Sequence, residues 1–233
     1  MELSVGDDAG VLPGASWGDE PSSVKDVVDW VAREIIEGRL ASGDDLNSVD
    51  LAKRFKLSRT PVREALFVLS TQGLVDWSPR RRPRVSVMTL KEAREIYQLR
   101  AVLYGEVSMT IVVRACQEDI DALWRAHRPL AEAAARHDVD AYFRANVGFR
   151  DEELRIAGNA IFKEVLDSMK QRMDRLRHFS TSLPGRMERS CADHQRLCQA
   201  YAARDGVLAA ALNRSIVISA LHAIETSWSG EAI

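Results

Sequence analysis

The sequence has few of the features that mark a secreted, disulfide-stabilised or membrane protein. Its three cysteines, Cys116, Cys191 and Cys198, contain no CxxC pair, so they predict reduced thiols rather than a disulfide framework or a zinc site. Apolar runs are only a few residues long, and the N-terminal stretch has no basic segment leading into an apolar one. We therefore expect a cytoplasmic protein without a membrane segment.

Catalytic signatures are missing as well. No GxSxG, Walker loop, GxGxxG or HExxH motif occurs. The run Asp151-Glu152-Glu153 offers carboxylates, but three successive residues fan around a helix instead of converging, so we interpret it as a solvated face. The sequence therefore predicts that the protein is not an enzyme.

Charge is distributed very unevenly along the chain, although the net charge is only -2. Residues 1–50 carry 3 Lys or Arg and 12 Asp or Glu, whereas residues 51–90 carry 9 and 2. A compact basic segment inside a mildly acidic protein predicts a local surface that binds a polyanion.

The N-terminal part of the chain shows the pattern of a small helical domain. Residues 1–21 mix Gly, Asp, Pro and Ser without a period and predict a mobile tail. Apolar spacing then predicts three helices, near 24–38, 48–57 and 58–73, with Ser48 and Ser58 as N-caps.

Two short β segments follow, near 74–77 and 84–87, separated by the sequence SPRRRP. This pattern predicts a hairpin with an arginine-rich tip. Three helices and a β-hairpin wing make residues 22–88 a winged helix-turn-helix domain.

The rest of the chain predicts a second, all-helical domain over residues 89–233. No strand pattern recurs, and the fold class is therefore mainly α, with a bundle of six or so antiparallel helices. The expected helices lie near residues 89–115, 118–136, 138–157, 160–179, 186–203 and 206–228.

The third helix of the first domain begins with the sequence SRTPVR and suits DNA recognition. Arg59 and Arg63 are four residues apart and share a helix face, as side chains that contact bases or phosphates must. Any single arginine could equally belong to a solvated face, but the clustering of so many favours a DNA surface. The predicted DNA-binding residues are Ser58, Arg59, Thr60, Arg63, Arg80, Arg81 and Arg82, with Arg84 beside them.

The sequences LSRTPVREAL at 57–66 and QGLV at 72–75 resemble the winged helix-turn-helix of the GntR family of transcription regulators. The resemblance spans residues 24–88 and implies a homodimer, usually a repressor, that binds double-stranded operator DNA. Arg82 stands where the family usually has a glycine, which could take a positive φ, so this wing tip is expected to turn differently.

The second domain resembles the FCD ligand-binding domain of the FadR subfamily. Many relatives bind a divalent metal through one Asp and three His, and those positions correspond here to Asn146, Arg150, His194 and Ile216. Arginine has no lone pair to offer a metal, and isoleucine has no donor at all. We therefore expect no metal and no other cofactor in this pocket.

An arginine that points into a helical bundle needs an anion. Asn146 and Arg150 are four residues apart, so both can point inward. The anion could be a small metabolite effector bound by Arg100, Asn146, Arg150 and His194, or a carboxylate of the chain itself, such as that of Glu106.

Two other functions remain open at this stage. One is a degenerate regulator that binds no small molecule. The other is a helical enzyme with an accessory nucleic-acid-binding module, which would require inward-facing pairs of carboxylate and histidine on the later helices.

Overall fold

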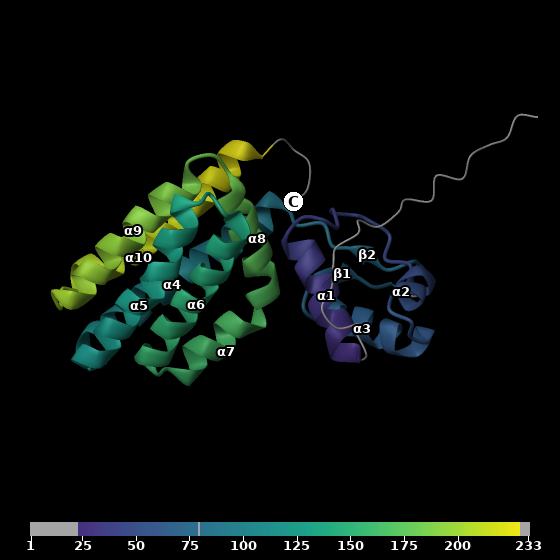
Figure 1. The fold of residues 1–233 in the computed structure, drawn as a ribbon, viewed down its shortest axis with the longest axis horizontal. Helices are drawn as coiled ribbons and strands as arrows, with labels where there is room; N and C mark the ends of the chain where they lie inside the picture. Colours follow the sequence, from purple (N-terminus) through teal and green to yellow (C-terminus); the bar gives the residue numbers. More distant parts are fainter. Residues whose placement is uncertain (1–22, 79, 229–233) are drawn as a thin grey trace, which may run out of the picture.

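The computed structural model describes residues 23–78 and 80–228. The predicted tail, Pro79 of the predicted wing turn and the last five residues lie outside this part of the chain. The described residues form a small N-terminal head and a larger helical bundle beside it (Figure 1).

The head consists of α1 (Val24–Ile36), α2 (Ser48–Arg54) and α3 (Arg59–Thr71), followed by β1 (Val75–Asp76) and β2 (Arg84–Val85). The two strands pair antiparallel, with Val75 opposite Val85 and Asp76 opposite Arg84. The predicted winged helix-turn-helix is therefore confirmed, although its strands are shorter than expected.

The head is held together by one face of each helix. In α1 the buried side chains include Val27, Val31 and Ile35, and in α3 they include Val62 and Leu66, all in one apolar cluster. This spacing of three and four residues is the helical period that the sequence predicts. It leaves the opposite face of α3 exposed to solvent.

One predicted helix start was wrong. The N-cap of α2 is Asn47, whose side-chain oxygen accepts a hydrogen bond from the backbone N–H of Val49, rather than Ser48. Asparagine and serine are about equally good N-caps, so the sequence alone did not separate two neighbouring candidates.

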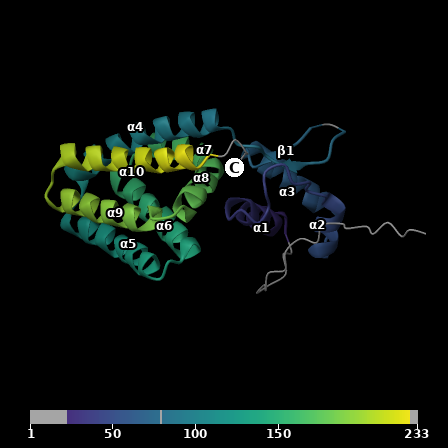
Figure 2. The same cartoon turned by 90° about the horizontal axis from the view of Figure 1, so that it is seen from above.

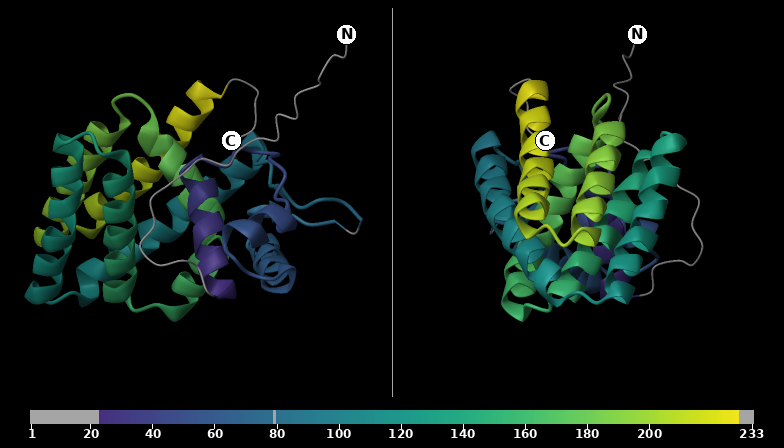
Figure 3. Two further views of the ribbon diagram at one scale, coloured as in Figure 1. Left: turned by 45° about the vertical axis from the view of Figure 1, so that its right-hand side comes forward. Right: turned by 90° about the vertical axis from the view of Figure 1, so that its left-hand side faces the viewer.

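Within the described residues the bundle comprises seven helices. Figure 2 and the two views of Figure 3 show how they are arranged. They are α4 (Leu90–Arg114), α5 (Gln117–Ala135), α6 (Val139–Ala157), α7 (Ala160–Ser168), α8 (Lys170–Ser182), α9 (Arg186–Ala202) and α10 (Gly206–Ser227). The single helix predicted over 160–179 is in fact two. The break falls at Met169, which has φ −112° and ψ 4°, and no Gly or Pro marks it in the sequence.

Among the described helices only α10 is long and apolar enough to cross a membrane, with a mean hydropathy of 1.6 over its most apolar window. In the structure α10 packs lengthwise against α4 and also contacts α9 and α8. Its core side chains include Ile216, Val217 and Ile224. The apolar side chains of α10 that face these helices are therefore core residues of the bundle.

Helix α8 connects the bundle to the head. The buried guanidinium of Arg175 donates to the backbone oxygen of Ser86 at 2.8 Å and to the hydroxyl of Ser42 at 2.6 Å. Burial without a carboxylate at hydrogen-bond distance lowers the pKa of Arg175 to about 10. One side chain of the bundle thus contacts both the base of the wing and the turn after α1.

Candidate nucleic-acid interface and bundle cavity

The exposed face of α3 carries the predicted recognition residues. Arg59, Thr60 and Arg63 are all exposed, whereas Val62 and Leu66 of the same helix are buried. The guanidinium carbon of Arg63 lies 5.7 Å from the centre of the Trp77 ring. This helix can therefore present two permanent cations and a hydroxyl to a DNA groove.

The first turn of α3 is open. Ser58 has the backbone conformation of an N-cap, but its side chain makes no capping hydrogen bond, contrary to the expectation that it caps the helix. The first amides of the helix therefore keep hydrogen-bonding capacity, and the helix dipole adds positive potential at the same point. Such an N-terminus can bind a phosphate oxygen.

The wing is fixed to the rest of the head by Asp45. The carboxylate of Asp45 pairs with Arg84 at 2.7 Å and more loosely with Arg82 at 3.8 Å. Backbone hydrogen bonds from Leu46 to Pro83, at 2.8 Å, and from Val85 to Asp44, at 2.9 Å, join the same segments. Two of the wing arginines are thus partly engaged within the head.

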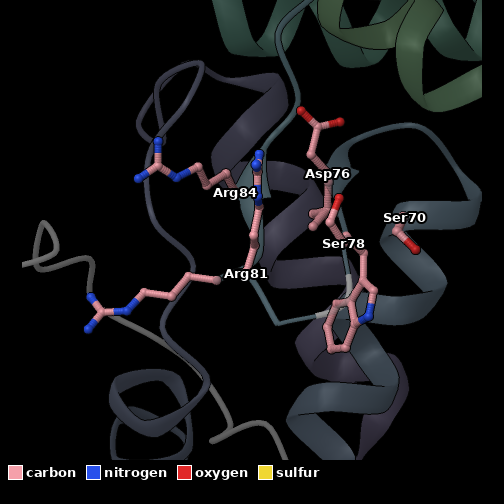
Figure 4. A pocket seen from close by; sticks show the side chains of 8 residues that line it. Ser70, Asp76, Ser78, Arg81 and Arg84 are labelled. Carbon is pink, nitrogen blue, oxygen red and sulfur yellow. The ribbon is translucent and has the colours of Figure 1, made fainter.

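The left-handed residue of the wing turn is Arg80, with φ 65°, rather than Arg82 where the family usually has glycine. Arg80 and Arg81 are exposed and have no ion-pair partner among the described residues. Beside the wing lies an open cleft of about 720 Å³, and Figure 4 shows it with Arg81 and Arg84 on one side and Ser70 on the other.

A narrow cavity lies within the bundle, where side chains of α4, α6, α8, α9 and α10 meet. Three predicted residues, Arg100, Asn146 and Arg150, line it, as does Ile216. Its free volume is about 20 Å³, which is room for a single water molecule. Sequence reasoning missed Arg177 and Arg186, which also line the cavity, because they come from α8 and α9 and no spacing relates them to the others.

Arg150 has its own partner in the chain. Its Nη1 donates to Glu153 Oε2 at 2.7 Å and to the side-chain oxygen of Asn213, and both members of the ion pair are at most 3% exposed. The internal partner is therefore Glu153 and not Glu106, which pairs with Arg214 on the surface. Glu153 is fully buried, so the interpretation of its acidic run as a solvated face was wrong for this residue.

Arg100 and Arg186 differ from Arg150 because neither forms an ion pair with a carboxylate of the described residues. Both residues are buried, and the Nε and Nη1 atoms of each have no hydrogen-bond partner within residues 23–78 and 80–228. The guanidinium carbon of Arg100 lies 4.6 Å from the centre of the Tyr97 ring, and the Tyr97 hydroxyl is also unpartnered. Burial lowers the pKa of both arginines. A buried guanidinium with unpartnered N–H groups is costly, and an added anion would offset that cost.

His194 is fully buried and is arranged as a neutral ring. Its Nδ1 lies 2.7 Å from the backbone oxygen of Ser190, which can only accept, so Nδ1 carries the proton. Its Nε2 then faces the side-chain nitrogen of Asn146 at 3.5 Å. Burial, and next the charge of Arg150, hold the pKa of His194 well below its usual range.

These residues do not fit a divalent metal. Asn146 presents its amide nitrogen to His194, Arg150 is a permanent cation beside them, and Ile216 has no donor atom. Within residues 23–78 and 80–228 no group of three His, Cys, Asp or Glu side chains could hold a metal ion. The donor set thus differs from the one Asp and three His that the family resemblance implies.

The buried His194 makes the stability of the chain depend on pH. The pKa of His194 is lower in the folded chain than in the unfolded chain. Below about pH 6.5 this histidine therefore binds a proton in the unfolded chain but stays neutral in the folded chain. We expect the free energy of unfolding to fall by up to about 1.4 kcal/mol per pH unit in this range. Urea unfolding at about pH 7 and about pH 5.5 tests this, and His194→Gln should show a shallower dependence. Equal slopes would contradict it.

Comparison with known proteins agrees with this two-part organisation. Residues 24–85 match the bacterial regulatory proteins of the gntR family, and residues 95–218 match the FCD domain. The HTH-type transcriptional regulator BphR of Paraburkholderia xenovorans LB400 is 30% identical over 207 residues, which cover 84% of this chain and 80% of BphR. The HTH-type transcriptional repressor RspR of Escherichia coli K12 is 24% identical over 174 residues, which cover 75% of this chain and 76% of RspR.

The fold agrees with that of a solved structure, E. coli McbR/YncC. The two superpose with a TM-score of 0.76 at 20% identity, covering 90% of this chain and all of McbR. The resemblance that the sequence suggested is thus confirmed, and it points to a transcription regulator rather than to an enzyme. The chain belongs to the GntR family of bacterial regulatory proteins and carries an FCD domain behind its winged helix-turn-helix.

Proposed function

We propose that this regulator is a homodimeric repressor that binds a near-palindromic operator and is controlled by a small anionic metabolite in the cavity of the bundle. The observation that carries the DNA part is the exposed face of α3, where Arg59 and Arg63 stand beside an uncapped helix N-terminus. In this arrangement α3 enters a major groove, and the wing arginines Arg80 and Arg81 contact the flanking backbone or a minor groove.

The surface for a second copy is the shared outer face of α4 and α10. The exposed apolar residues of α4 are three, seven and four residues apart, which is typical of helix-pairing seams, and α10 packs beside them. A second copy would cover this apolar area and place two recognition helices on the two halves of an operator. The residues are Leu99, Val102, Met109 and Val113 of α4, and Val207, Leu208 and Ile218 of α10.

The salt dependence of binding tests the DNA part of the proposal. Contacts to phosphates release bound cations, so operator affinity should fall steeply as salt rises, by about a thousandfold or more between about 50 and 200 mM if six or more phosphates are neutralised. Fluorescence anisotropy with a labelled duplex measures this. A flat response would rule out binding through the basic face of the head.

The charge balance of the cavity favours an effector with two negative charges. Four arginines line the cavity, and two of them have carboxylate partners: Arg150 pairs with Glu153, and Arg177 pairs with Asp174 at 2.7 Å. Arg100 and Arg186 remain, and each would gain charge-assisted hydrogen bonds from a carboxylate or phosphate. A small dicarboxylate would satisfy both.

Such a ligand would have to move the cavity wall, because the free volume holds only one water. Arg177 and Thr181 of α8 belong to that wall, while Arg175 of the same helix contacts Ser42 and Ser86 in the head. Outward movement of α8 would therefore shift the head relative to the bundle. Effector binding would change operator affinity in this way, by favouring one arrangement of the two parts.

Thermal unfolding tests the effector part. At about a hundred times its Kd, a dianion should stabilise the folded chain by about 2.7 kcal/mol, which corresponds to a rise in Tm of several degrees. Malonate and succinate are suitable probes, and acetate at three times the concentration controls for ionic strength. Arg100→Met and Arg186→Met should each abolish the rise. If no dianion raises the Tm, the cavity is structural and the regulator without an effector is the better description.

A further inference from the structure

We propose that the second half of α3 reads base edges in the major groove, with Phe67 and Val68 contacting the methyl group of a thymine. This inference rests on the proposed binding of DNA by α3. Phe67 is 57% exposed and Val68 is 36% exposed, although both are large and apolar. They help to form a shallow hollow of about 650 Å³, which is lined by Thr60, Arg63, Glu64, Phe67, Val68 and Trp77.

The hollow continues the arginine face of the helix. Phe67 is four residues after Arg63, so the two lie one above the other on the same side of α3. The Phe67 ring also meets the Trp77 ring edge-on, with their centres 6.5 Å apart. A groove floor in contact with Arg63 would therefore extend over Phe67.

The negative charge of Glu64 favours contact of this region with base edges on the floor of the groove rather than with the phosphate backbone. Glu64 is exposed on the same face, and its carboxylate would be repelled by a phosphate. A carboxylate can instead accept a hydrogen bond from the amino group of cytosine, and an apolar side chain can contact the methyl of thymine.

The geometry sets the position of the thymine within the operator. Four residues of α-helix rise about 6 Å, which is about two base-pair steps. For a helix lying along the groove, the thymine should thus be about two base pairs from the base that Arg63 contacts.

Selection of binding sites from a random duplex pool, with the full-length chain, provides the test. Each thymine of the selected site is then replaced by deoxyuridine, which removes only the methyl group. At one position in each half-site we expect the affinity of the wild-type chain to fall about fourfold, the value of one buried methyl. Phe67→Ala and Phe67→Leu should show a smaller fall at that position.

Val87→Ala is the matched control, because Val87 is 50% exposed in the same domain but does not line the hollow. It should keep the wild-type penalty for deoxyuridine. If every thymine can be replaced without loss, or if the penalty is the same in the Phe67 variants, the inference is wrong and the hollow serves a protein partner or none. If the wild-type chain selects no site at all, the proposed DNA binding itself fails.

Discussion

Replacing both Arg59 and Arg63 with alanine is expected to lower operator affinity by at least about thirtyfold. A good arginine contact to a base contributes about 1 to 3 kcal/mol of discrimination, and a dimer would lose it in both half-sites. Both side chains are exposed and outside the apolar cluster of the head, so the fold should persist. Anisotropy titrations of a selected operator and of a scrambled duplex measure the loss, and circular dichroism checks the fold.

Two further variants separate charge from geometry. Arg63→Lys keeps the positive charge but loses the planar fork, so it should retain binding to scrambled DNA and lose preference for the operator. Arg128→Ala removes the same charge from the exposed surface of α5 in the bundle and should leave operator affinity unchanged. Operator binding by the double alanine variant that equals the wild type would show that α3 is not the recognition helix.

The sequence predicted the head well because each pattern that determines a helix or strand of the head lies within a short stretch of the chain. The helical period of the apolar side chains and the spacing of Arg59 and Arg63 each lie within one short segment, where the period determines the structure. The wing was predicted from its two β segments and the turn between them. The role of Asp45, which holds Arg84 from a distant loop, had no local signal.

The cavity was only half predictable for the opposite reason. Arg100, Asn146 and Arg150 were found because a family resemblance marked their positions, whereas Arg186 and Arg177 enter the same cavity from other helices. The burial of Glu153 was missed because its neighbours in the run are more exposed and only the rotation of α6 separates them. Which members of a polar run turn inward depends on the packing of several helices together.

Replacing Glu153 with glutamine is expected to destabilise the chain by roughly 3 to 5 kcal/mol, which is a large part of the stability of a typical domain. The substitution keeps the shape of the side chain and removes its charge. Arg150 would then be a buried cation without a counterion, although Asn213 still accepts one of its hydrogen bonds. The hydroxyl of Tyr201 also donates to Glu153, at 2.7 Å, and would meet a weaker acceptor. Urea unfolding measures the loss.

The same helix supplies a matched control in Glu152→Gln. Glu152 pairs with Arg155 at 2.8 Å with the same spacing of three residues, but Arg155 is 56% exposed. A solvated pair of this kind is worth at most about 1 kcal/mol, so Glu152→Gln should cost far less than Glu153→Gln. Equal costs would mean that burial adds nothing to the Arg150 pair.

A double variant distinguishes loss of the pair from loss of charge balance. Arg150→Met combined with Glu153→Gln removes both charges, so it should be more stable than Glu153→Gln alone even though it lacks one more native side chain. The reason is that the single variant buries an uncompensated guanidinium and the double variant does not.

In Glu153→Gln the cavity also holds three cations without carboxylate partners, Arg100, Arg150 and Arg186, instead of two. Inorganic phosphate should therefore raise the Tm of this variant more than that of the wild type, and a smaller rise would show that anions do not reach the cavity.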